Sequence, residues 1–280
     1  MMHCRGRWRT VATRRRRVAR AARNAWYAVA LPLLLITLGA AQRRREAPPS
    51  EQDFKVNNVA YDGTFTFVRF RYTPARIGWG GGGGYFGGVN YSWDHDYPRA
   101  ERHFSLILRE LTMVRPHAEG TNILGADDPE LFKYPIAYVS EPGFWTLTDE
   151  EAATLRAYLL KGGTMILDDF VQWDWPSAEA AIQKILPDAR PMLLDVTHPL
   201  FDSFFAIESL EMVHPYRGFP SAFLGVFEGN DPSGRLLMII NYNNDMGESW
   251  EYSNTGFIPI ELSNEAFKLG VNYIVYAMTH

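Results

Sequence analysis

The stretch LTDEEAATLRAYLLKGGTMILDD (residues 147–169) decides the fold class. Thr148 followed by Glu151 predicts a capping box at the start of a helix, and Gly162 suits the end of that helix. The segment TMILDD (164–169) then predicts a buried strand that ends in two aspartates, and YPIAYVS (134–140) before the helix predicts another strand. Strand, helix and strand within about 36 residues form a βαβ unit, so the sequence predicts a parallel sheet.

Further segments extend this alternation along the chain. Alternating or apolar runs predict strands at 65–72, 222–227 and 235–241, and helical periodicity predicts helices at 97–112, 177–186 and 264–278. The glycine-rich segment IGWGGGGGYFGG (77–88) predicts a loop, and it lacks the Lys-Ser/Thr that follows a phosphate-binding loop. The fold class is therefore α/β, with a three-layer sandwich around a mainly parallel sheet.

The N-terminal region has the pattern of an export signal. Residues 1–24 contain nine arginines and no acidic residue, and residues 25–41 are apolar with small side chains at the end. This pattern predicts a signal peptide over 1–41, with an uncleaved inner-membrane anchor as the alternative. Residues 42–53 are polar and predict a linker, and a single α/β domain is expected over 54–280. The expected location is the periplasm or the exterior, with membrane contact only through an uncleaved N-terminal segment.

Charge and cysteine content exclude several functions. Without residues 1–41 the chain keeps 19 of its 28 basic residues and all 32 acidic ones, a net charge of −13. Such a surface disfavours nucleic acid as a partner. The one cysteine, Cys4, lies in the predicted signal, so no disulfide and no thiol chemistry are expected in the exported protein. We expect no cofactor.

Several phrases carry a resemblance to a known family. They are YPRAERHFSLILRELT (97–112), LFKYPIAYV (131–139), LRAYLLKGGTMILDD (155–169), THPLF (197–201) and LGVNYIVYAMT (269–279). In this order they resemble the bacterial domain of unknown function 4159 (DUF4159). That family looks like a divergent branch of the class I glutamine amidotransferase-like fold, which has a flavodoxin-like topology, and is nearest there to the ThuA-like group. The shared features look like Gly162-Gly163, His198-Pro199, Gly234-Arg235 and Asn272.

The resemblance also implies a lost mechanism. Amidotransferases of this fold carry a nucleophilic cysteine after the strand that corresponds to 164–168, and the ThuA-like group often has a histidine there. This sequence has Asp168-Asp169-Phe170 at that place. A thiolate, an acyl-enzyme and ammonia transfer are therefore not expected.

Asp168 and Asp169 are the leading candidates for a functional site. In an open parallel sheet, ligands bind beyond the carboxyl ends of the strands, and these aspartates stand at such an end. Successive strand residues point to opposite faces, so one aspartate is expected to line a site and the other to brace the turn. The alternative is that one caps the turn and the other meets solvent.

Other segments supply weaker candidates. NYNNDMGESW (241–250) follows a predicted strand and suggests a binding loop with Asn243, Asp245 and Trp250. Trp173 stands close to the aspartate pair and suits stacking on a sugar. The His-Pro phrases place His198 and His214 in predicted turns, and neither has the spacing of a metal-binding pair, so no metal is predicted. The triplet DHD (94–96) is interpreted as a polar turn before a helix.

These observations favour a non-catalytic domain that binds a ligand or a protein partner in the cell envelope, with carbohydrate as the candidate ligand. The alternative is a carbohydrate-active hydrolase or related enzyme that uses Asp168, Asp169 and His214. A third hypothesis is a subunit of an envelope assembly.

Overall fold

The structure is a computed structural model that describes residues 58–75, 92–118 and 120–280. The predicted signal or anchor (1–41), the linker (42–53) and the glycine-rich segment (77–88) lie outside the described residues. Within the described ranges, every helix is too short or too polar to cross a membrane.

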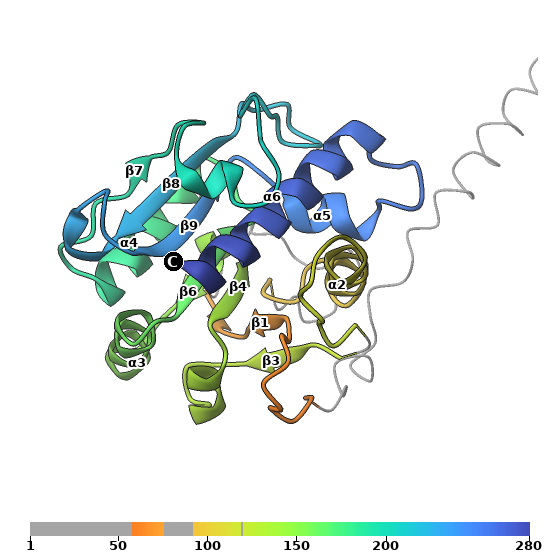
Figure 1. Cartoon of the computed structure of the whole chain (residues 1–280). Coiled ribbons are helices and arrows are strands. Elements are labelled where there is room, and N and C mark those ends of the chain that lie inside the picture. The colour runs from red at the N-terminus through yellow and green to blue at the C-terminus, as the bar shows by residue number, and fades with distance from the viewer. Residues whose placement is uncertain (1–57, 76–91, 119) are drawn as a thin grey trace, which may run out of the picture. The chain divides into compact units, whose positions relative to one another are not determined.

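A seven-stranded sheet forms the centre of the domain, with the strand order β3-β1-β4-β6-β9-β8-β7 (Figure 1). The neighbouring strands β3, β1, β4, β6 and β9 run parallel to one another. Strand β8 pairs antiparallel with β9, and β7 pairs antiparallel with β8. The strands are β1 (Val68–Phe70), β3 (Asn122–Leu124), β4 (Ile136–Ser140), β6 (Thr164–Asp168), β7 (Met192–Leu193), β8 (Ala222–Phe227) and β9 (Leu236–Tyr242). A separate two-stranded sheet pairs β2 (Thr73–Pro74) with β5 (Trp145–Thr146).

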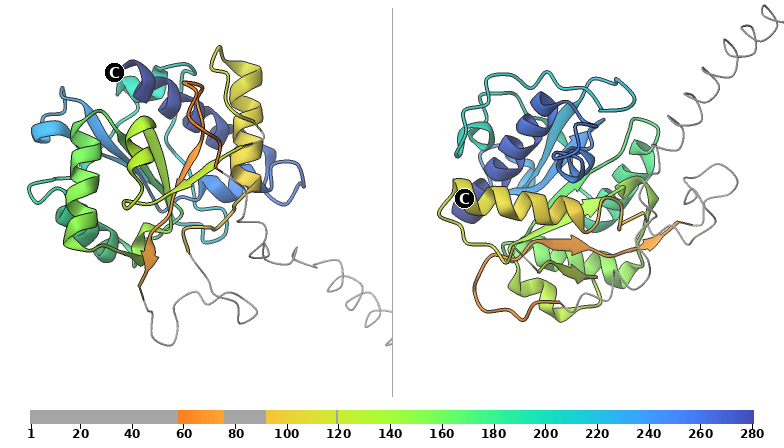
Figure 2. Two further views of the ribbon diagram at one scale, coloured as in Figure 1. Left: turned by 90° about the horizontal axis from the view of Figure 1, so that it is seen from below. Right: turned by 90° about the vertical axis from the view of Figure 1, so that its right-hand side faces the viewer.

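Helices lie on both sides of the main sheet (Figure 2). They are α2 (Arg99–Leu111), α3 (Asp149–Leu160), α4 (Trp175–Ile185), α5 (Met246–Glu251) and α6 (Ile260–Thr279). Short 3₁₀ helices are η2 (Pro129–Lys133), η3 (Pro142–Phe144), η4 (Pro199–Asp202) and η5 (Glu228–Asn230). Helices α2, α5 and α6 contact one another, as do α3 and α4, which fits a three-layer α/β sandwich.

The predicted βαβ unit is confirmed. Thr148 and Glu151 form both bonds of the capping box at the start of α3, and Gly162 after that helix has a φ of 115°. Strands β4 and β6 pair in parallel from Ile136–Thr164 to Ser140–Asp168. Most predicted boundaries lie within two residues of the observed ones, and two differ by three or four residues. Strand β1 pairs only over 68–70, and α6 begins at Ile260 because Pro259 fits the N-cap and starts the helix earlier.

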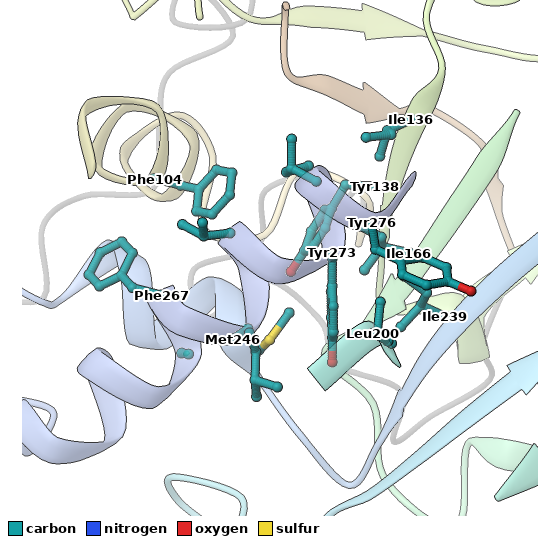
Figure 3. Close-up of a cluster of buried hydrophobic side chains, with 14 of the residues drawn as sticks. Phe104, Ile136, Tyr138, Ile166, Leu200, Ile239, Met246, Phe267, Tyr273 and Tyr276 are labelled. Carbon is teal, nitrogen blue, oxygen red and sulfur yellow. The ribbon is translucent and has the colours of Figure 1, made fainter. Parts of the chain in front are cut away.

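The core on one face of the sheet packs strand residues against α2 and α6 (Figure 3). Ile136, Tyr138, Ile166 and Ile239 from the strands meet Phe104 of α2 and several residues of α6, all of them buried. Alternate residues of the same strands are also buried, as a sheet covered on both faces requires: Ala137, Val139, Met165, Leu167 and Ile240. The carboxyl ends of the adjacent parallel strands β4, β6 and β9 therefore lie together, in a sheet that is covered on both faces.

Candidate functional site

Asp168 ends β6 and is a structural residue. Its Oδ2 accepts hydrogen bonds from the Tyr138 hydroxyl at 2.6 Å and from the backbone N–H groups of Met246 and Gly247 at 2.8 and 3.1 Å. Its Oδ1 accepts from Asn241 Nδ2 at 2.9 Å. Burial raises the pKa of Asp168 to about 6, although these donors act against the shift. The carboxylate therefore joins β4, β6, β9 and α5, and four donors already occupy it.

Asp169 follows the strand with a φ of 60°, and its side chain has different partners from that of Asp168. Its Oδ2 lies 2.5 Å from Nδ1 of His95 and 3.2 Å from the Ser140 hydroxyl. A positive φ is uncommon outside glycine, and here it marks a sharp turn directly after the strand. Burial acts to raise the pKa of Asp169, but the charge and hydrogen bond of His95 lower it overall.

Asp169 and five other ionisable side chains converge, and we call these six residues the carboxylate cluster. Its members are His95, Asp96, Glu141, Asp169, Asp245 and Glu248. They come from the turn before α2, the residue after β4, the residue after β6, and the segment from the end of β9 into α5. Ligand atoms lie within 4.8 Å of one another in three overlapping groups: His95–Asp96–Glu248, His95–Glu141–Asp169 and Asp96–Asp169–Asp245.

Asp96 has the least satisfied carboxylate of this cluster. Its side chain has no exposed surface, and neither carboxylate oxygen accepts a hydrogen bond from any described residue. It packs against Gly247, where a Cβ would come within 2.3 Å of Oδ2. Asp245, also buried, caps α5 by accepting a hydrogen bond from the Glu248 N–H at 2.9 Å.

The electrostatics of the carboxylate cluster reflect an excess of acidic groups. Burial, followed by neighbouring carboxylates, raises the pKa of Asp96 and Asp245 well above the usual range. Burial and the Asp169 charge raise the pKa of Glu141 to about 8. The charge of Asp96 raises the pKa of His95, and burial opposes that shift. The imidazole of His95, with about half of its side chain exposed, connects this buried acidic group to solvent.

Comparison of the sequence with known protein families gives a match that includes the site. Residues 84–278 match the family described as domain of unknown function 4159 (DUF4159). The chain belongs to this family. All six members of the carboxylate cluster lie within the matched region, and the family description assigns no function to them. No curated protein matches the sequence significantly.

The structure brings some of the predicted residues of this DUF4159 chain to the carboxylate cluster. Asp169 and Asp245 belong to it, and His214 is buried close enough for its charge to affect the pKa of Asp169. Trp173 is 55% exposed, with Arg217 at 5.1 Å over its ring and Phe219 against its edge. Trp173 follows Asp169 by four residues in the sequence.

Other predicted residues have structural positions elsewhere. Trp250 is 2% exposed and packs against Phe104, so it belongs to the core rather than to a binding surface. Asn243 braces two loops, accepting from the Gln172 N–H and donating to the Pro220 carbonyl. His198 lies against Phe227, which pairs with Leu236 at the start of β9. His198 is therefore near the amino ends of the parallel strands, whereas Asp169 follows the carboxyl end of β6.

Four cluster residues were not among the predicted site residues: His95, Asp96, Glu141 and Glu248. The DHD triplet (94–96) was the available signal for two of them, and its interpretation as a polar turn is right for the backbone but omits the chemistry. Glu141 follows the strand β4 directly, so the carboxyl-end rule that selected Asp169 applies to it equally. Glu248 lies in the predicted binding loop 241–250 but was not singled out there, because its position depends on the short helix α5.

Proposed function

We propose that this protein is an exported, non-catalytic domain that binds a ligand in the cell envelope through the carboxylate cluster. The observation that carries the proposal is the convergence of five carboxylates and one histidine at the carboxyl ends of β4, β6 and β9. In open α/β sheets this edge is where ligands bind. Carboxylates held there at a cost in stability are more readily explained by binding than by packing.

The proposal includes an amidotransferase-like ancestry without the amidotransferase mechanism. A turn with a positive φ directly after β6 supports this assignment, because the nucleophile of that fold stands on a sharp turn after the corresponding strand. Asp169 occupies the place, and the sequence has no cysteine beyond Cys4. A carboxylate that is paired with His95 can accept hydrogen bonds from a ligand, but it cannot act as a thiolate.

Carbohydrate is the ligand class that we propose first. Carboxylates accept hydrogen bonds from hydroxyl groups, and the exposed ring of Trp173 offers a flat apolar surface for the CH face of a sugar. An envelope protein that presents hydroxyl or amine groups is the other partner that suits this charge.

The test is calorimetric titration of the purified protein with a panel of envelope oligosaccharides. Asp169→Asn and Trp173→Ala should each weaken binding at least tenfold, whereas Asp202→Asn, which removes the same charge from the exposed helix η4, should leave binding unchanged. Binding that survives both site substitutions would refute this site. Glutamine hydrolysis by the pure protein would refute the proposed loss of the amidotransferase mechanism.

A carbohydrate-active hydrolase is the second candidate, and one contact favours it. His95 Nδ1 lies 2.5 Å from Asp169 Oδ2, and a partly exposed imidazole held by a carboxylate is an arrangement that general acid–base catalysis uses. Release of aryl alcohol from aryl glycosides, abolished by Asp169→Asn but not by Asp202→Asn, would establish hydrolysis in place of binding alone.

A further inference from the structure

The carboxylate cluster has an unbalanced charge. Among the described residues, His95 is the one basic side chain within ion-pair distance of Asp96, Glu141 or Asp169, and Asp245 has no such partner. When these carboxylates are ionised, one protonated imidazole cannot balance their charge. Buried charges are normally paired or bound to a metal, so the imbalance points to a positive ligand.

Asp96 provides the second, independent observation. It is 5% exposed overall, its side chain is fully buried, and both oxygens lack a hydrogen-bond donor among the described residues. Each such oxygen loses its water without a replacement hydrogen bond from a described residue, and a bound ion is one of the partners that can compensate a buried polar atom of this kind. The same carboxylate belongs to two of the three groups in the cluster, so its oxygens face the other acids.

The spacing matches a coordination sphere. Asp96, Asp169 and Asp245 each place one carboxylate oxygen within 4.8 Å of the others. Oxygen ligands lie about 2.0–2.6 Å from Mg²⁺ or Ca²⁺, so two ligands of one ion are separated by at most about 5 Å. Three buried carboxylates at this spacing are close enough to share a single ion.

We propose that the carboxylate cluster binds a hard divalent cation, with Asp96, Asp169 and Asp245 as its carboxylate ligands. The inference rests on the proposed function, since it names what occupies the same site. Carboxylate oxygens suit Mg²⁺, Ca²⁺ or Mn²⁺, and the described part of the site offers no thiolate for a softer metal. His95, Glu141 and Glu248 lie around this triad, where they can complete the coordination sphere or hold its water ligands.

The experiment uses the full purified chain after dialysis against EDTA, with MgCl₂, CaCl₂ and MnCl₂ added separately. Thermal melting and calorimetry report binding. At a hundredfold excess over Kd, at least one of the ions should raise Tm by about 5–10 °C.

The decisive variant is Asp96→Asn. It relieves repulsion, so its metal-free Tm should equal or exceed that of the parent, while the rise with metal should disappear. A purely structural aspartate would give the reverse, a lower Tm and an unchanged response. Asp245→Asn is a second variant that retains the helix cap, because asparagine caps as well as aspartate. Asp202→Asn is the control and should respond to metal like the parent.

The outcomes separate this inference from the proposed function. If none of the three salts raises Tm or gives heat of binding, or if Asp96→Asn and Asp245→Asn both respond like the parent, the cation site is refuted. Oligosaccharide titration in EDTA is the independent arm. Binding there that Asp169→Asn abolishes would leave the proposed function standing while the cation site falls. Cation binding without any oligosaccharide binding would support the cation site and remove carbohydrate as the ligand.

Discussion

Arg69 and Glu101 form a buried ion pair that holds the segment before α2. Substitution of either residue leaves the other charge buried without its partner, and the two substitutions should differ because glutamate can take up a proton whereas arginine cannot lose one. Neither side chain has exposed surface, and Nη2 of Arg69 lies 2.5 Å from Oε1 of Glu101. Nη1 of Arg69 also donates to the backbone carbonyls of Trp93 and His95, at 3.2 and 2.9 Å. The pair therefore positions the segment that delivers His95 and Asp96 to the carboxylate cluster.

The two single substitutions should differ in their pH dependence. Arg69→Met leaves a buried glutamate, which can take up a proton. At pH 7, about 2.5 units above the usual glutamate pKa of 4.5, that protonation costs about 3.4 kcal/mol, and at pH 5 it costs about 1 kcal/mol. Glu101→Met leaves a buried guanidinium, which cannot lose its proton at either pH. Removal of one partner of a buried pair costs about 3–5 kcal/mol.

Urea denaturation at pH 7 and pH 5 checks this reasoning. The loss of unfolding free energy in Arg69→Met should shrink by about 2.5 kcal/mol at pH 5, whereas the loss in Glu101→Met should change by less than about 0.5 kcal/mol. The double variant should lose less than the sum of the two. An Arg69→Met deficit that is the same at both pH values would refute the assignment of the cost to the glutamate charge.

Four further outcomes are expected. Asp168→Ala should lower the free energy of unfolding by about 3 kcal/mol or more in urea, because it leaves several buried donors without an acceptor. Gly247→Ala should displace the Asp96 carboxylate and abolish the cation-induced rise in Tm, since the new Cβ would come within 2.3 Å of Oδ2. Trp250→Ala should cost about 3–5 kcal/mol in urea without changing the Kd for the cation in samples that remain folded. Metal-free protein should lose stability as pH rises from about 4.5 to 8, because the folded state raises the pKa of Glu141 to about 8 and so favours the protonated acid. Thermal melts in EDTA across this pH range measure the loss, and a Tm that rises with pH would contradict the prediction.

The fold was predictable because its signals are local. The capping box at Thr148, the stop at Gly162 and the apolar runs on either side are each set by a few neighbouring residues, and together they specify the βαβ unit. Strand alternation also predicted that Asp168 and Asp169 have different roles. In the structure, Asp168 accepts hydrogen bonds from backbone N–H groups of α5, and Asp169 belongs to the carboxylate cluster.

The rest of the site was not predictable because long-range contacts assemble it. The segment 94–96 has the composition of a polar turn whether or not it faces β6. Its position depends on bonds from distant residues, among them Arg69 on β1 and Asp169 after β6. Trp250 failed as a ligand-binding prediction for a related reason. Its neighbours along the chain are polar, but the cap of Asp245 starts α5 in an orientation that places the indole against α2.

The described domain holds buried charge in three ways, and the contrast between them locates the need for a ligand. Asp168 is balanced by donors, two of which are backbone N–H groups of α5. Glu101 is balanced by Arg69, ion against ion. Asp96 has no hydrogen-bond donor among the described residues, and its one ion-pair contact there, His95 at 3.9 Å, also lies within reach of Glu141 and Asp169. Because no described residue donates to Asp96, the free energy of this buried carboxylate can be lowered by a species that enters from outside, either a proton or a cation.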